Sequence, residues 1–512
     1  MAKRSIIDQP IAALQPRAGN PRTHSTKQIQ QIAASIRRFG FTNPVLIDDA
    51  NGIIAGHGRV AAAKLLGRVT VPTIKLSGMS EADIRAYVIA DNKLAENAGW
   101  DRNLLAIEFQ YLANLDIDFD LSITGFELPE IDVLIGELSL GEKDGKPDPA
   151  DEVPAVAPGP AITRAGDIWS IGRHRLVCGD STKADIYSAL LGEEQAQMVF
   201  TDPPYNVPIS GHVSGLGKVQ HREFAMASGE MSPAAFTEFL TTVFRHLAAV
   251  SIDGAIHYQC MDWRHMTEML AAGEAAYSEL KNLCVWAKSN GGMGSLYRSQ
   301  HELVFVFKSG TAPHINNVEL GKHGRYRTNV WSYPGVNAFG GNRDDLELHP
   351  TVKPVALVMD AILDCSKRKG IVLDAFAGSG TTLIAAERTG RRGYGVEIDP
   401  LYCDVILRRM KSACRLDAVL AANGQTFAQV EVERRAEDDA SEHTMAIDET
   451  TSDDMAAEAR EAAGEARRSV RDGINPIEAR KASKGAEEAA TYTFGTFAEE
   501  VVNSIESGFR NE

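Results

Sequence analysis

Two short segments of this 512-residue chain combine residue types that can do chemistry, and each follows an apolar run. Asp202-Pro203-Pro204-Tyr205 comes soon after residues 197–200, and residues 374–382 (Asp-Ala-Phe-Ala-Gly-Ser-Gly-Thr-Thr) follow the run 371–373. Each pattern predicts a buried parallel strand that ends in a functional loop, where open α/β sheets bind their ligands. The first loop presents a carboxylate, two rigid prolines and an aromatic ring, and the second is a glycine-rich turn that opens a helix.

The glycine-rich turn has the features of a small-molecule site. Gly378 and Gly380 allow a tight turn and close approach of a ligand, and the helix that begins at Thr381 offers free N–H groups. No lysine follows the second glycine, which excludes a Walker loop. The next strand pattern ends in Glu397, a position from which an acid binds ribose hydroxyls. Capping of the following helix is the alternative role for Glu397 or Asp399.

Two further elements carry a family resemblance together with these loops. Asp180 ends an upstream strand pattern, where capping of a helix is the alternative role. The hexapeptide 349–354 (His-Pro-Thr-Val-Lys-Pro) precedes an apolar helix pattern at 355–365. With the catalytic loop first and the cofactor elements later, the four elements resemble β-type (permuted) DNA amino-methyltransferases of the N6-adenine/N4-cytosine family.

The resemblance implies an α/β fold, that of a Rossmann-like S-adenosylmethionine-dependent methyltransferase, with S-adenosyl-L-methionine as the cofactor and no metal. It implies that Asp180 contacts the adenine of the cofactor and that Glu397 binds its ribose. It also implies that Thr351 and Lys353 bind its methionine carboxylate. The residues implied to bind the cofactor are Asp180, Thr351, Lys353, Asp374, Phe376, Gly378, Gly380, Thr381 and Glu397.

The same resemblance implies methyl transfer to an exocyclic amine of double-stranded DNA, catalysed by Asp202, Pro203, Pro204 and Tyr205. The nitrogen lone pair of such an amine is delocalised into the ring. A carboxylate and a carbonyl that accept hydrogen bonds from the two N–H groups of the amine would free this lone pair. The prolines fix that carbonyl, and Tyr205 offers a face for an extruded base. In this family, Asp at the position of residue 202 is usual in enzymes that methylate adenine, and Ser is usual in those that methylate cytosine. Adenine N6 is therefore the favoured target, and cytosine N4 is the alternative.

The segment between these elements, about residues 206–348, is expected to recognise the DNA target. Seven basic and two acidic residues lie between Lys281 and Arg327, so a basic surface is compatible with the net charge of −16. We predict DNA contacts by Arg325, Arg327 and Trp331, with a core position as the alternative for Trp331.

A small α/β domain is predicted at residues 1–100. Residues 28–39 have helical spacing, 43–48 have the pattern of a strand, and Gly56-His57-Gly58-Arg59 precedes the helix expected at 60–66. This segment resembles the Gly-x-x-Arg-x-x-Ala phosphate-binding box of the ParB/sulfiredoxin-like fold, and a helix N-terminus with Arg59 forms an anion site. His57 and Gly58 replace the usual Glu and Arg, which argues against nucleotide hydrolysis.

Composition predicts the remaining organisation. We expect a helical accessory segment at 101–140, a Pro-rich linker at 141–162, the methyltransferase domain at 163–415 and an acidic tail at 416–512 with no assigned fold. The tail holds 22 acidic and 10 basic residues. The six cysteines lack the spacing of zinc ligands, and no apolar run of about 18 residues predicts a membrane span. We therefore expect a cytoplasmic protein whose partner is DNA; a homodimer is left open.

An alternative hypothesis, from another functional class, is that the chain is a non-enzymatic, ParB-like DNA-binding protein with a degenerate methyltransferase domain. The intact Asp-Pro-Pro-Tyr sequence favours the enzyme.

Overall fold

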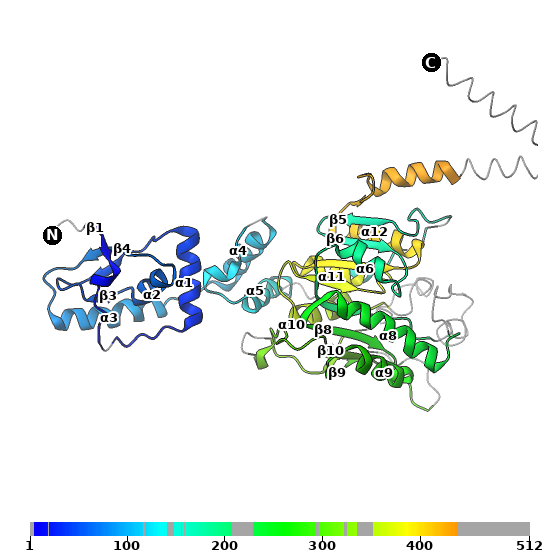
Figure 1. Cartoon of the computed structure of the whole chain (residues 1–512), viewed down its shortest axis with the longest axis horizontal. Helices are drawn as coiled ribbons and strands as arrows, with labels where there is room; N and C mark the ends of the chain where they lie inside the picture. Colours follow the sequence, from blue (N-terminus) through cyan, green and yellow to red (C-terminus); the bar gives the residue numbers. More distant parts are fainter. Residues whose placement is uncertain are drawn as a thin grey trace, which may run out of the picture. The chain divides into compact units, whose positions relative to one another are not determined.

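The computed structural model describes residues 5–438, except residues 19, 116–117, 141–147, 155, 158, 207–228, 290, 292–295, 322–324 and 335–351. Two sheets organise the described part of the chain, a four-stranded sheet near the N-terminus and a ten-stranded sheet in the larger domain (Figure 1). None of the helices in the described part is long and apolar enough to cross a membrane.

The first domain is an α/β unit with strand order β1-β4-β2-β3. Its elements are β1 (Ile6–Pro10), η1 (Ile11–Ala13), α1 (Thr26–Phe39), β2 (Val45–Ile47), β3 (Ile53–Ala55), α2 (His57–Leu65), β4 (Thr70–Lys75) and α3 (Glu81–Glu96). Helix α2 begins three residues earlier than the sequence predicts, because Gly56 takes the left-handed conformation (φ 106°) and caps it. The residues predicted to bind an anion therefore form the first turn of α2.

A helical segment follows, with α4 (Arg102–Asn114), η2 (Leu121–Thr124), α5 (Leu128–Leu140) and η3 (Pro149–Asp151). It has its own apolar cluster, which includes Phe109 and Ile131. Helix α5 also contacts the larger domain, because the buried carboxylate of Asp132 pairs with Arg391 at 2.9 Å and Arg368 at 2.8 Å.

The described residues of the predicted linker at 141–162 make specific contacts that the composition does not indicate. In its described part, Ala150 is buried and its carbonyl accepts a hydrogen bond from Arg409 at 2.6 Å. Asp151 Oδ1 accepts from the backbone N–H of Val355 at 2.8 Å, so it caps a helix of the next domain. Side-chain and backbone hydrogen bonds, which a Pro-rich composition does not show, therefore tie this segment down.

The large sheet has the order β11-β9-β10-β8-β7-β12-β13-β6-β5-β14. Strands β8, β7, β12, β13 and β6 are parallel to one another, whereas β10 runs antiparallel to β8 and β9. The strands are β5 (Ile168–Ile171), β6 (His174–Cys178), β7 (Ala196–Thr201), β8 (Ser251–Met261), β9 (Glu279–Ala287), β10 (His301–Lys308), β11 (Val330–Ser332), β12 (Ile371–Asp374), β13 (Arg392–Glu397) and β14 (Ala418–Leu420).

Helices cover both faces of this sheet, as the buried clusters show. One cluster contains α10 (Val355–Cys365), α11 (Thr381–Arg388) and α12 (Pro400–Cys414); the other contains α6 (Ala184–Leu191), α8 (Pro233–Ala249) and α9 (Met266–Ala276). Strand β7 lies between β8, which follows it along the chain, and β12, which comes much later. The strand order reverses at this point, and α/β proteins bind ligands beyond the carboxyl ends of such strands. The expected α/β, Rossmann-like fold is confirmed.

The methyltransferase domain extends past the end predicted at residue 415. Strand β14 pairs with β5, and Leu420 and Val430 are buried in the same cluster as α12. The Phe427 ring lies edge-on to Trp169, with centroids 5.5 Å apart. A three-residue edge strand has too little pattern to be visible among the Ala- and Glu-rich residues of the tail. Residues 439–512, most of the predicted tail, lie outside the described residues.

Candidate active site

The Asp-Pro-Pro-Tyr loop leaves the sheet at the carboxyl end of β7. The strand is buried because it is flanked on both sides by parallel partners, and the prolines end its pairing. Asp202 remains about a quarter exposed, and its Oδ1 accepts a hydrogen bond from the Tyr205 hydroxyl at 2.7 Å. One residue earlier, Thr201 donates to Asp374 Oδ1 at 2.7 Å, which joins the catalytic loop to the glycine loop.

Lys353 lies within the polar cluster around Asp202. Its buried ammonium donates to Asp202 Oδ2 at 2.5 Å and to the Tyr205 hydroxyl at 3.2 Å, and pairs with Glu302 Oε2 at 2.8 Å. Burial alone would lower the pKa of Lys353, but the two carboxylates raise it well above its ordinary value. Lys353 thus pairs with the carboxylates of Asp202 and Glu302, and its predicted contact with the methionine carboxylate stays a prediction.

Glu302 and Lys288 belong to this cluster, and sequence reasoning missed both. Strand β10 is antiparallel to β8, so its first residues lie beside the last residues of β8, at the edge where β7 ends. Glu302 is buried there and forms ion pairs with Lys353 and Lys288. Burial opposes ionisation of Glu302, but the two ammonium groups outweigh it and lower its pKa to about 2. The available signal was an acid inside the apolar run His301–Lys308.

Asp374 is held by the protein's own donors. Besides Thr201, its carboxylate accepts hydrogen bonds from the Thr382 hydroxyl at 2.6 Å and from the backbone N–H of Phe376 at 3.0 Å. Burial raises its pKa to about 6, although these hydrogen bonds oppose the shift. Asp374 therefore shapes the start of the glycine loop, and its predicted direct contact with the cofactor stays a prediction.

The two loop glycines have different surroundings. Both are left-handed, with φ 52° at Gly378 and φ 84° at Gly380. A Cβ at Gly380 would lie 2.9 Å from Ile406 of α12, inside the protein, whereas among the described residues a Cβ at Gly378 would meet only the Phe376 carbonyl, at 3.9 Å. The turn and the packing against α12 therefore require a glycine at 380, and its predicted contact with the cofactor stays a prediction. Gly378 faces open space within the described part of the chain.

Glu397 closes the glycine loop from the end of β13. Its Oε2 accepts from the backbone N–H of Gly378 at 2.8 Å, and Oε1 accepts from the backbone N–H of Asp399 at 2.9 Å. Burial raises the pKa of Glu397 to about 7, against the effect of these two donors. Asp399 caps α12, which was one of the roles that the sequence left open, and ribose binding by Glu397 stays a prediction.

The other predicted cofactor residues lie near the same edge or outside the described chain. Asp180 follows β6, and its Oδ1 accepts from the Thr182 backbone and hydroxyl at 2.8 and 2.7 Å. Phe376 packs near Phe239, with ring centroids 5.9 Å apart. The buried Thr381 hydroxyl accepts from Arg409 at 3.0 Å. Thr351 lies outside the described residues.

The structure does not support the predicted DNA contacts of Arg325, Arg327 and Trp331. Arg325 pairs with Asp364 at 2.5 Å, and Arg327 pairs with Asp364 and Asp360 at 3.1 Å each. Trp331 is buried and donates to the Thr328 carbonyl at 3.0 Å. Two acids one turn apart on α10 thus neutralise the two arginines, and the core position that was the alternative for Trp331 is correct.

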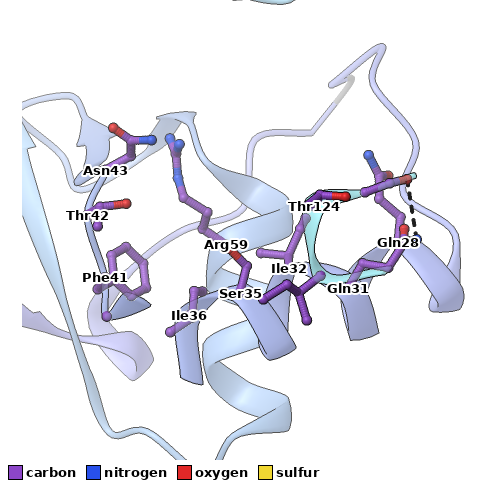
Figure 2. Close-up of a pocket in the computed structure, with 13 residues that line it drawn as sticks. Gln28, Gln31, Ile32, Ser35, Ile36, Phe41, Thr42, Asn43, Arg59 and Thr124 are labelled. Atoms are coloured by element: carbon purple, nitrogen blue, oxygen red, sulfur yellow. Dashed lines mark hydrogen bonds between the residues drawn. The ribbon is translucent and has the colours of Figure 1, made fainter. Parts of the chain in front are cut away.

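A pocket of about 360 Å³ is lined mainly by the first domain, Arg59 among its residues, and on one side by residues 123–125 of the helical segment. Figure 2 shows Arg59 among side chains from α1, the loop 40–43 and η2. The Arg59 guanidinium donates to the Pro44 carbonyl at 3.4 Å, and its buried Nε has no hydrogen-bond partner within the described part of the chain. His57 instead accepts a hydrogen bond from the Arg17 backbone, and a Cβ at Gly58 would meet His24 at 3.0 Å. Of the predicted anion-site residues, Arg59 alone is shown to line the pocket.

Three family models match the chain in succession. The ParB N-terminal domain matches residues 1–92, the ParB-methyltransferase HTH domain matches 103–165, and the DNA methylase model matches 196–408. The helix-turn-helix match covers the segment for which the sequence analysis predicted only helices and a linker.

Individual relatives resemble separate parts of the chain. The ParB-like nuclease domain-containing protein YnaK of Escherichia coli K12 is 53% identical over 79 residues, which are 15% of this chain and 91% of YnaK. The DNA adenine methyltransferase YhdJ of the same strain is 42% identical over 96 residues, 19% of this chain, and the match spans only 32% of YhdJ.

A similar solved structure is the M1.HpyAVI–SAM complex, which is 18% identical with a TM-score of 0.33 over 46% of this chain and 98% of that one. The catalytic and cofactor motifs, their place at one edge of the sheet and the family matches agree. The chain is a fusion that belongs to the ParB family through its N-terminal domain and to the S-adenosyl-L-methionine-dependent N6-adenine/N4-cytosine DNA methyltransferases through its larger domain.

Proposed function

We propose that the chain methylates the exocyclic N6 of adenine in double-stranded DNA. The observation that carries this proposal is the arrangement at the end of β7, where Asp202 and Tyr205 are hydrogen-bonded side by side and tied to the glycine loop through Thr201 and Asp374. A degenerate domain would have no reason to retain a buried lysine, two carboxylates and a tyrosine in one connected cluster, since unpaired charges there are costly.

The proposed role of each residue follows from the chemistry of an aromatic amine. Asp202 and a backbone carbonyl fixed by Pro203 and Pro204 accept the two N–H bonds, so the nitrogen lone pair turns away from the ring. Tyr205 stacks on the extruded base, because the amine is out of reach within the duplex. Bound S-adenosyl-L-methionine supplies the electrophilic methyl group.

The residues present fit that cofactor. Among the described residues, Gly378 has open space where a side chain would stand, and α11 starts directly after the loop with its N–H groups at the same edge of the sheet. We propose that Gly378 and the start of α11 approach the cofactor, that Glu397 binds its ribose, and that Asp180 and Phe376 lie beside its adenine.

The ribose contact makes cofactor binding depend on pH. Ribose hydroxyls donate to an ionised carboxylate, and Glu397 becomes protonated as the pH falls through about 7. We therefore expect S-adenosyl-L-methionine to bind more weakly at about pH 6 than at about pH 8, since the raised pKa disfavours the ionised form. Calorimetric titrations of wild type and Glu397→Gln test this. The glutamine variant should bind weakly with a flatter pH profile; identical profiles would remove Glu397 from the ribose site.

The choice of adenine N6 over cytosine N4 rests on two observations. The catalytic loop has Asp at 202, as is usual in adenine-specific loops, and the chain is 42% identical over 96 residues with a DNA adenine methyltransferase. Transfer of a labelled methyl group to unmethylated DNA, followed by digestion to nucleosides, separates the candidates. N6-methyladenine supports the proposal, N4-methylcytosine selects the alternative, and no transfer favours the non-enzymatic DNA-binding reading.

A second function is favoured by the pocket of the first domain. We propose that it binds a phosphate-type anion, because the Arg59 guanidinium reaches it with an unsatisfied Nε and arginine pairs well with such groups. Inorganic triphosphate, titrated at low salt, should lose about 10-fold or more in affinity with Arg59→Ala, the loss of one charge-assisted hydrogen bond. Lys64→Ala removes a charge from an exposed position of the same helix and should change little. Equal losses would contradict the site.

A further inference from the structure

Both carboxylate oxygens of Asp202 are engaged before any substrate arrives. Oδ1 accepts from the Tyr205 hydroxyl at 2.7 Å and Oδ2 accepts from Lys353 at 2.5 Å. The target amine needs an acceptor on the same carboxylate. One of these two donors must therefore give up or share its place, and a donor that loses its partner inside the protein is costly.

Glu302 already stands within reach of both donors. Its Oε2 lies 3.1 Å from the Tyr205 hydroxyl and 2.8 Å from Lys353 Nζ, while Oε1 pairs with Lys288. The four charged groups form a balanced set of two carboxylates and two ammonium groups. Glu302 is 7% exposed in a strand whose other residues are mostly apolar, so its retention there calls for a role besides packing.

We propose that Glu302 is a positioning residue of the methyl-transfer reaction, which receives the hydrogen bonds of Tyr205 and Lys353 when Asp202 turns to the target amine. The inference rests on the proposed function and deepens it. In this arrangement Lys353 keeps a carboxylate partner throughout, and the Tyr205 ring becomes free to face the base. Lys288 holds Glu302 from the outer side, where it is partly exposed.

Replacement of Glu302 by glutamine has a definite expected result. The amide keeps the shape but not the charge, so Lys353 has Asp202 as its remaining carboxylate partner and binds it more firmly. We expect kcat to fall about 10-fold to 100-fold, the effect of one charge-assisted hydrogen bond, with the affinity for S-adenosyl-L-methionine unchanged. Retained cofactor affinity also shows that the variant is folded.

The pH profile separates this role from a merely structural one. Burial raises the pKa of Asp202 and the charge of Glu302 raises it further, while Lys353 opposes both. Asp202 must be ionised to accept the amine, so activity is lost as the pH falls through its pKa. Without the charge of Glu302 the pKa of Asp202 falls. In a plot of kcat against pH, the acid limb should therefore move to lower pH, although kcat at the plateau is lower than in wild type.

Other groups that face the cluster do not confuse this comparison. Burial raises the pKa of Cys260 on β8 well above its usual range, so the thiol stays neutral, and the two carboxylates raise the pKa of Lys353, so its ammonium stays charged. Burial raises the pKa of Asp374 on β12 to about 6, but Asp374 is present in both enzymes. The difference between the two profiles therefore reports on Asp202.

The experiment compares single-turnover rates of the full chain, Glu302→Gln and Glu279→Gln on the same unmethylated DNA across pH. Glu279 lies on the neighbouring strand β9 and is half exposed, so its variant should match wild type. A lower plateau with an acid-shifted limb for Glu302→Gln alone supports the inference. Wild-type rates in that variant, or a fall with no shift of the limb, would overturn it while leaving the proposed function intact. A wild-type chain that transfers no methyl group would overturn both.

Discussion

Replacing Asp202 by alanine should eliminate methyl transfer and leave cofactor binding nearly unchanged. The carboxylate is the acceptor that draws the lone pair out of the ring, and the groups that contact it at the end of β7 cannot replace it, since Lys353 and the Tyr205 hydroxyl are both donors toward it. Removal of an essential group in such a constellation costs orders of magnitude in rate. Methyl transfer should be measured under single-turnover conditions, with the cofactor affinity measured on the same sample.

Tyr205 provides the graded comparison for this prediction. Tyr205→Phe keeps the ring and loses the hydrogen bond to Asp202, so it should retain much of the activity. Tyr205→Ala also loses the stacking face, a contact worth roughly 1–3 kcal/mol, and should lose about 10-fold to 100-fold in rate. The expected order of rates is wild type, then Tyr205→Phe, then Tyr205→Ala, with the Asp202 variant inactive. An active Asp202→Ala enzyme would contradict the mechanism.

Alanine at Gly380 should mainly lower the stability of the protein, whereas alanine at Gly378 should mainly weaken cofactor binding. Each substitution costs about 1–2 kcal/mol for a left-handed residue with a side chain. At Gly380 the new methyl group also meets Ile406 at 2.9 Å, so overpacking adds about 1–3 kcal/mol and the variant should unfold at lower temperature. At Gly378 the methyl group enters space that no described residue fills, so that variant should fold better than Gly380→Ala but bind the cofactor about 10-fold or more weakly.

Thermal unfolding and calorimetric titration with S-adenosyl-L-methionine, applied to both variants, test this prediction. If Gly378→Ala binds the cofactor like wild type, the open side of Gly378 does not face the cofactor. If Gly380→Ala is as stable as wild type, α12 accommodates the methyl group more easily than the packing indicates.

The parts of the site that the sequence predicted are those encoded locally. Asp202 directly follows β7, Glu397 is the last residue of β13, and Gly378 lies in the loop that begins where β12 ends, so a short window of sequence contains both the strand and the residue near its end. The parallel arrangement then brings the three ends to one edge. The same reasoning found α1, β2 and α2 of the first domain, although the positive φ of Gly56 moved the start of α2. It did not predict β1, β4 or α3.

The residues that sequence reasoning missed or misplaced depend on long-range contacts. Glu302 joins Asp202 through the antiparallel pairing of β10 with β8, which no local pattern shows. Arg325 and Arg327 belong to a segment in which basic residues outnumber acidic ones. Their ion-pair partners Asp360 and Asp364, however, come from a helix later in the chain. The ion pair of Lys353 with Asp202 likewise joins residues 151 positions apart, so no local pattern predicts it.

The most direct test of the central claim is single-molecule sequencing of DNA from a methylation-free host that expresses the chain. We expect N6-methyladenine at a defined short sequence, and we expect the mark to be absent from a host that expresses Asp202→Ala at the same level. N4-methylcytosine in place of N6-methyladenine, or the same marks with both chains, would contradict the account of the site at the end of β7.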